Sequence, residues 1–167
     1  MPRKAHETDR AIRASCSSMA EQLEVKRLAL IVEDEALIVM EMEDVLAAEG
    51  FACTVATDQA EVEALSVGRL AVAIVDLRLR GDVVGQSIIR LLRSRIRNLP
   101  VVVVTGYNGQ VPQADLRGLG GPTIRLQKPV DSTDLARAVR EVIDLAHRGT
   151  TLPSHRRRED GFRHAAC

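Results

Sequence analysis

Five polar residues with chemically useful side chains stand at the ends of short apolar runs. They are three acids, one hydroxyl and one amine: Glu33, Asp34, Asp76, Thr105 and Lys128. Carboxylates gathered in one crevice repel each other and lose solvation, and a divalent cation among them relieves both penalties. Because the available ligands are oxygens and water, this set predicts Mg²⁺, with Mn²⁺ as the alternative.

A cation and an amine beside a carboxylate also suggest a reaction. A carboxylate in this setting can attack phosphorus and form an acyl phosphate. Phosphoryl transfer depends mainly on positioning and on neutralising charge. Here Mg²⁺ and Lys128 would neutralise the phosphoryl oxygens, and the Thr105 hydroxyl would donate a hydrogen bond to a third oxygen. The set therefore predicts a site for a phosphoryl group.

Each of these residues also has an ordinary structural interpretation. An aspartate that ends a strand commonly caps a turn, and Glu33 with Asp34 suits the positive end of a helix dipole. Thr105 precedes a glycine, as turn residues often do, and Lys128 alone is an ordinary surface residue. The functional interpretation is favoured because four strand ends each supply a residue type that one phosphoryl site needs.

The elements that must position these residues are predicted from hydrophobic periodicity. Short, uninterrupted, β-branched runs are typical of strands buried on both faces of a parallel sheet. Three such runs are clear and two are weaker: Leu28–Val32, Val72–Val75, Val101–Val104, Ala52–Ala56 and Ile124–Leu126.

Helical periodicity fills the intervals between these runs. We predict helices over residues 36–48, 58–67, 85–97 and 135–146, the last with apolar residues on one face for three turns. Asp131 or Ser132 can cap that helix. Residues 109–122 contain four Gly and two Pro, so any helix there must be short and poorly stabilised.

Alternation of strands and helices specifies an α/β fold with a doubly wound, five-stranded parallel sheet and helices on both faces. In the strand order 2-1-3-4-5, strands one and three are adjacent, so the three carboxylates are expected to converge at the carboxyl edge. We assign residues 27–147 to this domain, residues 1–26 to a mobile extension and residues 148–167 to a mobile basic tail.

Charge and composition exclude several classes of protein. Residues 28–146 hold twelve Lys or Arg and seventeen Asp or Glu, a net charge of −5, whereas both ends are basic. A DNA-binding domain places its basic residues on a folded face, and aromatic residues are only 2% of this chain. No apolar run is long enough to cross a membrane. Three scattered cysteines argue against a disulfide scaffold or zinc site and predict a cytoplasmic location.

The segments that carry the site residues resemble the signatures of the receiver domain of two-component response regulators. They are Leu30-Ile-Val-Glu-Asp-Glu, Ala73-Ile-Val-Asp-Leu, Val104-Thr-Gly and Gln127-Lys-Pro. The resemblance covers about residues 27–146 and implies the flavodoxin-like receiver fold. Thr105-Gly-Tyr, together with Asp76-Leu-Arg-Leu-Arg-Gly, is similar to a subgroup of stand-alone receivers known from alphaproteobacteria.

This resemblance implies a role for each matching residue. Asp76 is the phospho-accepting aspartate, Asp34 a direct Mg²⁺ ligand, and Glu33 the neighbouring acid that acts through water. The backbone carbonyl of Arg78 is a third metal contact, while Thr105 and Lys128 bind the phosphoryl group.

The resemblance also implies partners. Receivers take the phosphoryl group from a sensor histidine kinase or a histidine phosphotransfer protein, and they switch through helix four, strand five and helix five. The residues outside 28–147 are too few at either end to fold as an effector. We therefore expect output through contact with a downstream protein, of unknown identity, or through onward phosphotransfer. A homodimer through the switching face is left open.

Three positions depart from the usual receiver pattern. Arg125 stands where strand five commonly carries the aromatic residue that reports the switch, and Arg80 stands where a proline is common. Tyr107 follows the Thr-Gly pair. It either replaces the missing aromatic or shields the rim of the site. Tyr107 and Arg125 are therefore the switch candidates, and the glycine-rich segment 109–122 is the expected moving element.

Four other functions compete with this interpretation. Arg125 supports a phosphorylation-independent binding module, and a phosphate sink would have the same sequence. A phosphatase of the haloacid-dehalogenase type needs a second aspartate where this chain has Arg78. A nucleotide-binding domain needs a G-x-G-x-x-G or P-loop motif, which the sequence lacks. We therefore expect a signalling protein and not a turnover enzyme.

Overall fold

The computed structural model describes residues 26–66, 68–106 and 116–150. Strands and helices alternate along the chain, as the sequence predicts. The strands are β1 (Arg27–Val32), β2 (Phe51–Ala56), β3 (Leu70–Asp76), β4 (Val101–Thr105) and β5 (Thr123–Gln127), and the helices are α2 (Ala36–Ala48), α3 (Gln59–Ala64), α4 (Gly85–Arg95) and α5 (Ser132–Thr150).

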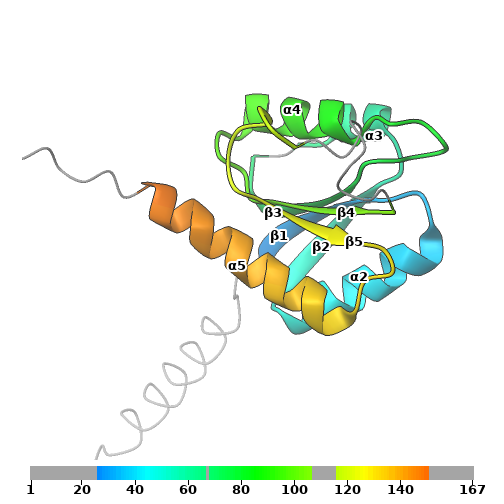
Figure 1. The fold of residues 1–167 in the computed structure, drawn as a ribbon, viewed down its shortest axis with the longest axis horizontal. Coiled ribbons are helices and arrows are strands. Elements are labelled where there is room, and N and C mark those ends of the chain that lie inside the picture. Colours follow the sequence, from blue (N-terminus) through cyan, green and yellow to red (C-terminus); the bar gives the residue numbers. More distant parts are fainter. Residues whose placement is uncertain (1–25, 67, 107–115, 151–167) are drawn as a thin grey trace, which may run out of the picture.

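All five strands are parallel and follow the order β2-β1-β3-β4-β5. Helices α3 and α4 cover one face of the sheet, and α2 and α5 cover the other (Figure 1). The predicted fold class and strand order are therefore confirmed. None of the described helices is long and apolar enough to cross a membrane.

Continuous apolar runs form these strands because both faces of the sheet are buried. Along β1, Leu30 and Val32 point into the core beneath α3 and α4, whereas Ala29 and Ile31 point into the core beneath α2 and α5. All four side chains are completely buried. Alternate residues thus supply two separate cores, and both faces of the strand are apolar from Ala29 to Val32.

The ends of several elements differ from the prediction. Helix α3 ends at Ala64 instead of residue 67, where Leu65 adopts an extended conformation. The Arg95 guanidinium donates hydrogen bonds to the carbonyls of Val62, Glu63 and Leu65, at a helix end where carbonyls lack their usual helical partners. Helix α4 ends at Arg95 instead of residue 97. Helix α5 continues to Thr150, beyond the predicted stretch.

The segment predicted as a poor helix is only partly described. Residues 116–122 form turns and bends, and residues 107–115, including Tyr107, lie outside the described residues. The predicted tails over 1–26 and 148–167 also lie mostly outside them.

Asp131 caps the last helix, which settles the choice between Asp131 and Ser132. Its Oδ1 accepts the Thr133 N–H at 2.7 Å. This backbone hydrogen bond lowers the pKa of the Asp131 carboxyl.

Candidate functional site

A pocket of about 480 Å³ opens at the carboxyl edge of the sheet. It is lined by residues from the ends of four strands and from the loops that follow them: Asp34, Glu35, Asp76, Arg78, Arg80, Gly81, Thr105, Gly106 and Lys128. The strand order produces this pocket, since the carboxyl ends of neighbouring parallel strands lie side by side. Most of the predicted site residues therefore meet in one place.

Lys128 is the central cation of the site. Its Nζ lies 2.6 Å from Glu33 Oε2 and 2.8 Å from Asp76 Oδ2. The backbone N–H of Lys128 also donates to the Thr105 carbonyl at 2.9 Å, which extends the β4–β5 pairing past the end of the strand. One lysine thus joins side chains that follow β1, β3 and β5.

Burial and hydrogen bonding have opposing effects on the pKa values of Glu33 and Lys128. Glu33 has only 1% of its surface exposed, and this desolvation raises the pKa of its carboxyl, although the hydrogen bond from Lys128 opposes the rise. Burial alone would lower the pKa of Lys128, but its hydrogen bonds to Asp76 and Glu33 outweigh burial, so the pKa is raised. The lysine therefore keeps its positive charge between the two acids.

Both carboxylate oxygens of Asp76 have partners. Oδ2 accepts from Lys128, and Oδ1 accepts the Arg78 backbone N–H at 3.0 Å. Asp76 is 7% exposed, and it lines the pocket, unlike Glu33. Among the buried acids of the described chain, Asp76 is therefore the one that opens toward a ligand.

Asp34 has a hydrogen-bond partner of its own in the loop after β3. Its Oδ2 accepts the Arg80 backbone N–H at 3.0 Å. Residues Leu79–Asp82 form a tight hairpin, with two hydrogen bonds between Leu79 and Asp82 and with Arg80 at φ 50°. The three carboxylates therefore lie at the carboxyl edge, where the sequence predicts them, but with different partners: Asp34 and Asp76 line the pocket, whereas Glu33 does not line it and is joined to Asp76 through Lys128.

The Arg80 side chain extends the hairpin's contacts to the loop after β2. Its guanidinium donates to Thr57 Oγ1 at 2.8 Å and lies 3.2 Å from Asp58 Oδ2. Asp58 is the N-cap of α3 and accepts the Glu61 N–H. The residue that replaces the common proline therefore joins the loops after β1, β2 and β3.

The donor set suits a hard divalent cation only in part. Within the described ranges, no three His, Cys, Asp or Glu side chains are grouped so that they alone could hold a metal ion. Asp34 and Asp76 line the pocket together with Arg78, whose carbonyl is the third predicted contact. Mg²⁺ is commonly bound by one or two carboxylates and keeps several of its waters. Two carboxylates and one carbonyl are therefore enough protein ligands for this ion.

Two further predicted residues, Thr105 and Arg125, differ in burial and in position. Thr105 is completely buried and lines the pocket, as predicted. Arg125 lies in β5 opposite Val103 and is half-buried. The pocket also contains Glu35, Gly81 and the Arg80 side chain, which sequence reasoning did not include.

Sequence signals for these missed residues existed but were weak. The Arg80-Gly81 pair could have indicated a tight turn, because glycine adopts positive φ freely and Gly81 has φ 93°. Nothing in the sequence indicated that this turn would bend back over the strand ends.

Comparison with known proteins agrees with this geometry. The family model for the response regulator receiver domain matches residues 29–140, more than half of the chain. The chain belongs to this family. The family is a signalling domain whose members work by phosphorylation, so this receiver domain is not a turnover enzyme of the usual kind.

Relatives and solved structures resemble the receiver domain at moderate identity. The photosynthetic apparatus regulatory protein RegA of Cereibacter sphaeroides is 32% identical over 79% of this chain and 68% of its own length. A sensor protein from Polaromonas is 31% identical, with a TM-score of 0.60 over 71% of this chain and 97% of that chain. A response regulator receiver protein from Sinorhizobium medicae is 26% identical, with a TM-score of 0.60 over 75% and 99%.

The curated relatives are longer than the matched region. This chain spans between 42% and 68% of their lengths. The match therefore concerns the receiver part of those proteins.

Proposed function

We propose that Asp76 accepts a phosphoryl group from a phosphohistidine, and that the receiver domain then signals by contact with another protein or passes the group onward. The phosphohistidine would belong to a sensor histidine kinase or a histidine phosphotransfer protein, and the exchange would take place in the cytoplasm. The observation that supports this most directly is the placement of Asp76, a nearly buried acid that faces the pocket and is paired with Lys128.

The reaction follows from this placement. An Asp76 oxygen would form a bond to phosphorus while the bond from phosphorus to the histidine nitrogen breaks, and the imidazole leaves. The Lys128 ammonium lies 2.8 Å from Asp76 Oδ2, so it is close enough to contact the phosphoryl oxygens after transfer. Buried Thr105 lines the same pocket and would donate a hydrogen bond to another oxygen. This is chemistry by positioning and charge neutralisation.

Mg²⁺ would be held by Asp34, Asp76 and the Arg78 carbonyl, with Glu33 acting through water, and Mn²⁺ is the natural substitute. When bound, the cation supplies further positive charge to the phosphoryl oxygens. Asp34 would have to release the Arg80 N–H or share its Oδ2. The pocket is lined by three acidic residues, Asp34, Glu35 and Asp76, and by three cationic ones, Arg78, Arg80 and Lys128, so it offers partners both for a cation and for phosphoryl oxygens.

Signalling would follow from a conformational switch. Lys128 and Thr105 are joined through the backbone at the end of the β4–β5 pair, so a pull on either side chain acts on β5 directly. Arg125 lies in that strand. Tyr107 is the second switch candidate, as the sequence predicts.

The first experiment would incubate the full chain with Mg²⁺ and acetyl phosphate and record its intact mass. We expect a gain of one phosphoryl group in the parent and in Asp82→Asn, and none in Asp76→Asn. Asp82 is a matched control because it is an exposed acid of the adjacent hairpin that does not line the pocket. Phosphoryl gain should be accompanied by changed hydrogen exchange over residues 106–125 in the parent.

Failure has a defined meaning. If the folded parent gains no phosphoryl group from acetyl phosphate or from a phosphorylated histidine kinase, the proposal is wrong and a phosphorylation-independent binding module becomes the better interpretation. If the parent is phosphorylated but hydrogen exchange does not change, a phosphate sink explains the result better than a switch does.

A further inference from the structure

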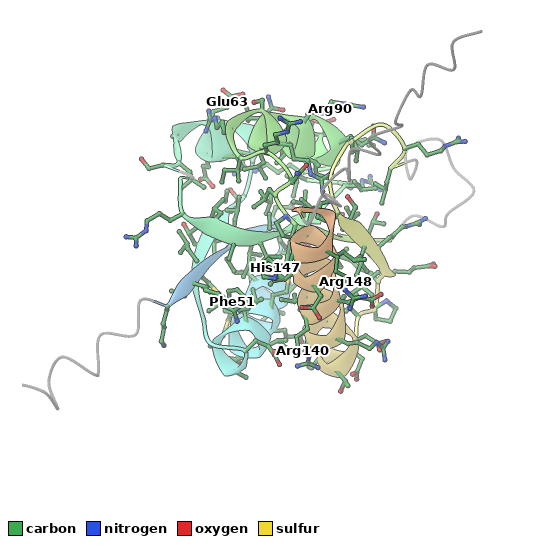
Figure 2. All side chains as sticks on the ribbon, turned by 90° about the vertical axis from the view of Figure 1, so that its left-hand side faces the viewer. Phe51, Glu63, Arg90, Arg140, His147 and Arg148 are labelled. Atoms are coloured by element: carbon green, nitrogen blue, oxygen red, sulfur yellow. The ribbon has the colours of Figure 1, made fainter. Side chains whose placement is uncertain are left out.

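A second hollow, of about 430 Å³, lies at the amino edge of the sheet, opposite the phosphoryl pocket. Its polar lining comes from the start of β1, the loop after α4 and the end of α5: Arg27, Arg97, Asn98 and His147. Figure 2 shows this end of the molecule, with Phe51 and His147 in view. We call it the amino-edge hollow.

The amino-edge hollow is basic although the domain around it is acidic. None of its lining residues is an Asp or Glu, whereas residues 28–146 carry a net charge of −5. Within the described part of the chain, no carboxylate pairs with Arg27 or Arg97. In contrast, Arg80, Arg137 and Arg140 each have an acidic partner. Arg27 and Arg97 therefore lack, among the described side chains, the carboxylate partner that these three arginines have.

Two of the polar residues are held in place by their surroundings. The Arg27 guanidinium lies 4.5 Å from the centroid of the Phe51 ring, a cation–π contact that favours this position of the charge at the start of β1. Asn98 adopts φ 61°, a left-handed conformation that asparagine tolerates better than most residues. This turn places Leu99 in the core while Arg97 and Asn98 remain exposed.

The floor of the amino-edge hollow is apolar. Ile143, Ala146, Pro100 and Ala71 contribute to it. A volume of this size suits a small molecule. Guanidinium groups pair with phosphate oxygens in a planar, two-pronged geometry, so two arginines suit the double charge of a phosphate monoester. The floor suits a flat ring attached to that phosphate.

We propose that the amino-edge hollow binds a nucleoside monophosphate, with its phosphate on Arg27 and Arg97 and its base on the apolar floor. The phosphate monoester could be free or could stand at the end of a nucleic acid strand, and both sources present the same chemistry. This inference does not depend on phosphorylation of Asp76, because the two sites are at opposite edges of the sheet.

The test is a titration of the full chain, labelled with ¹⁵N, with AMP as the probe. We expect shifts of the amide signals of residues 27, 71, 97–99 and 143–147, and no comparable shifts around Asp76. Inorganic phosphate alone and adenosine alone should each bind more weakly than AMP. A short oligonucleotide with a 5′-phosphate, compared with the same strand without it, distinguishes the second source.

Two matched variants decide whether the arginines are specific. Arg97→Gln should weaken AMP binding about tenfold, since it removes a charge-assisted contact. Arg90→Gln removes the same charge from an exposed position of α4, at the top of Figure 2 and above His147, and should change binding less than twofold. Asp76→Asn should bind AMP like the parent.

The proposal is overturned if AMP shifts none of the hollow's signals, or if Arg97→Gln and Arg90→Gln weaken binding equally. Equal binding of phosphate and AMP would also overturn it, because the apolar floor would then contribute nothing. Arg97 has an exposed side chain, so circular dichroism should report an unchanged fold in its variant.

Discussion

At the carboxyl edge of the sheet, side chains of opposite charge are held against each other, whereas at the amino edge cations line a hollow that contains no carboxylate. Lys128 contacts both Glu33 and Asp76, and Arg80 contacts Asp58. Arg27 and Arg97 line the amino-edge hollow without such a partner among the described residues. The first edge is thus arranged to neutralise its own charge, and the second is left with positive charge.

Helix dipoles favour acids at the carboxyl edge and cations at the amino edge, and the ends of α4 and α5 follow this preference in part. In a parallel sheet with crossover helices, every helix begins near the carboxyl edge and ends near the amino edge. Helix α5 has Asp134 in its first turn and has His147 and Arg148 in its last turn. Helix α4 ends with Arg93 and Arg95. Acids at positive helix ends and cations at negative ends are each stabilising. The direction of the helices therefore favours a different charge at each edge of the sheet. Whether the charges at an edge are neutralised depends on the ion pairs that form there, as Lys128 forms with Glu33 and Asp76.

The largest effect should come from breaking the neutralisation at the carboxyl edge. Lys128→Met leaves Glu33 and Asp76 without their cation, and we expect a loss of about 3 kcal/mol in the free energy of unfolding. The pKa of Glu33 should rise further, because the hydrogen bond that opposes burial is gone. A carboxyl with a raised pKa in the folded state binds its proton there first, so the variant should regain stability as pH falls.

Urea unfolding at neutral and at mildly acid pH would measure this effect. Adding Glu33→Gln to Lys128→Met removes the uncompensated charge and should restore part of the loss. If the single variant is as stable as the parent at neutral pH, then Lys128 does not neutralise a buried pair, and the contrast between the edges fails.

An identical substitution at the two edges should have different effects. A Cβ at Gly85 would lie 2.4 Å from the Asp76 carbonyl oxygen and 2.5 Å from Leu77 Cα, both backbone atoms. Gly85→Ala should therefore displace α4 from β3 and cost about 2 kcal/mol. Gly68, which precedes β3 at the amino edge, has open space around it, so Gly68→Ala should stay within about 0.5 kcal/mol of the parent.

Thermal unfolding of both glycine variants would check this comparison. Gly85→Ala should also slow phosphoryl uptake, since Gly85 packs on the backbone of Asp76 itself. Equal stability of the two variants would show that the contact at Gly85 relaxes without cost.

A smaller effect on stability should come from Arg93, a cation near the amino edge whose guanidinium has several hydrogen-bond acceptors. The Arg93 guanidinium donates to the carbonyls of Leu99, Leu119 and Pro122 and to Thr123 Oγ1. Burial lowers the pKa of Arg93, and all these acceptors are uncharged. Arg93→Lys cannot make the same set of bonds from one ammonium, and we expect a loss of about 1 kcal/mol.

Urea unfolding of Arg93→Lys would measure this loss, and Arg90→Lys, an exposed substitution on the same helix, would serve as the control. A matching result for both variants would mean that Arg93 does not hold the 116–123 segment. Arg97→Gln, which breaks no hydrogen bond or ion pair with a described residue, should leave stability nearly unchanged.

The fold could be predicted because its determinants are local in sequence. Each run such as Val101–Val104 must be buried on both faces, and each intervening helix has an apolar stripe, so a covered parallel sheet is the only consistent arrangement. The meeting of Asp76, Thr105 and Lys128 then follows from strand order alone. The end of α3 could not be predicted, because the hydrogen bond that satisfies the Leu65 carbonyl there comes from Arg95, thirty positions away.

Sequence by itself determined the sheet, its order and the identity of the residues at its carboxyl edge. Only the tertiary structure decided how their charges pair: Lys128 joins Glu33 to Asp76, and the Leu79–Asp82 hairpin takes Asp34. It also decided that Arg27, Arg97 and His147, separated by many residues, line one hollow. The physical reason is that hydrophobic periodicity specifies which face of an element is buried, whereas ion pairs depend on distances between side chains that are remote in sequence.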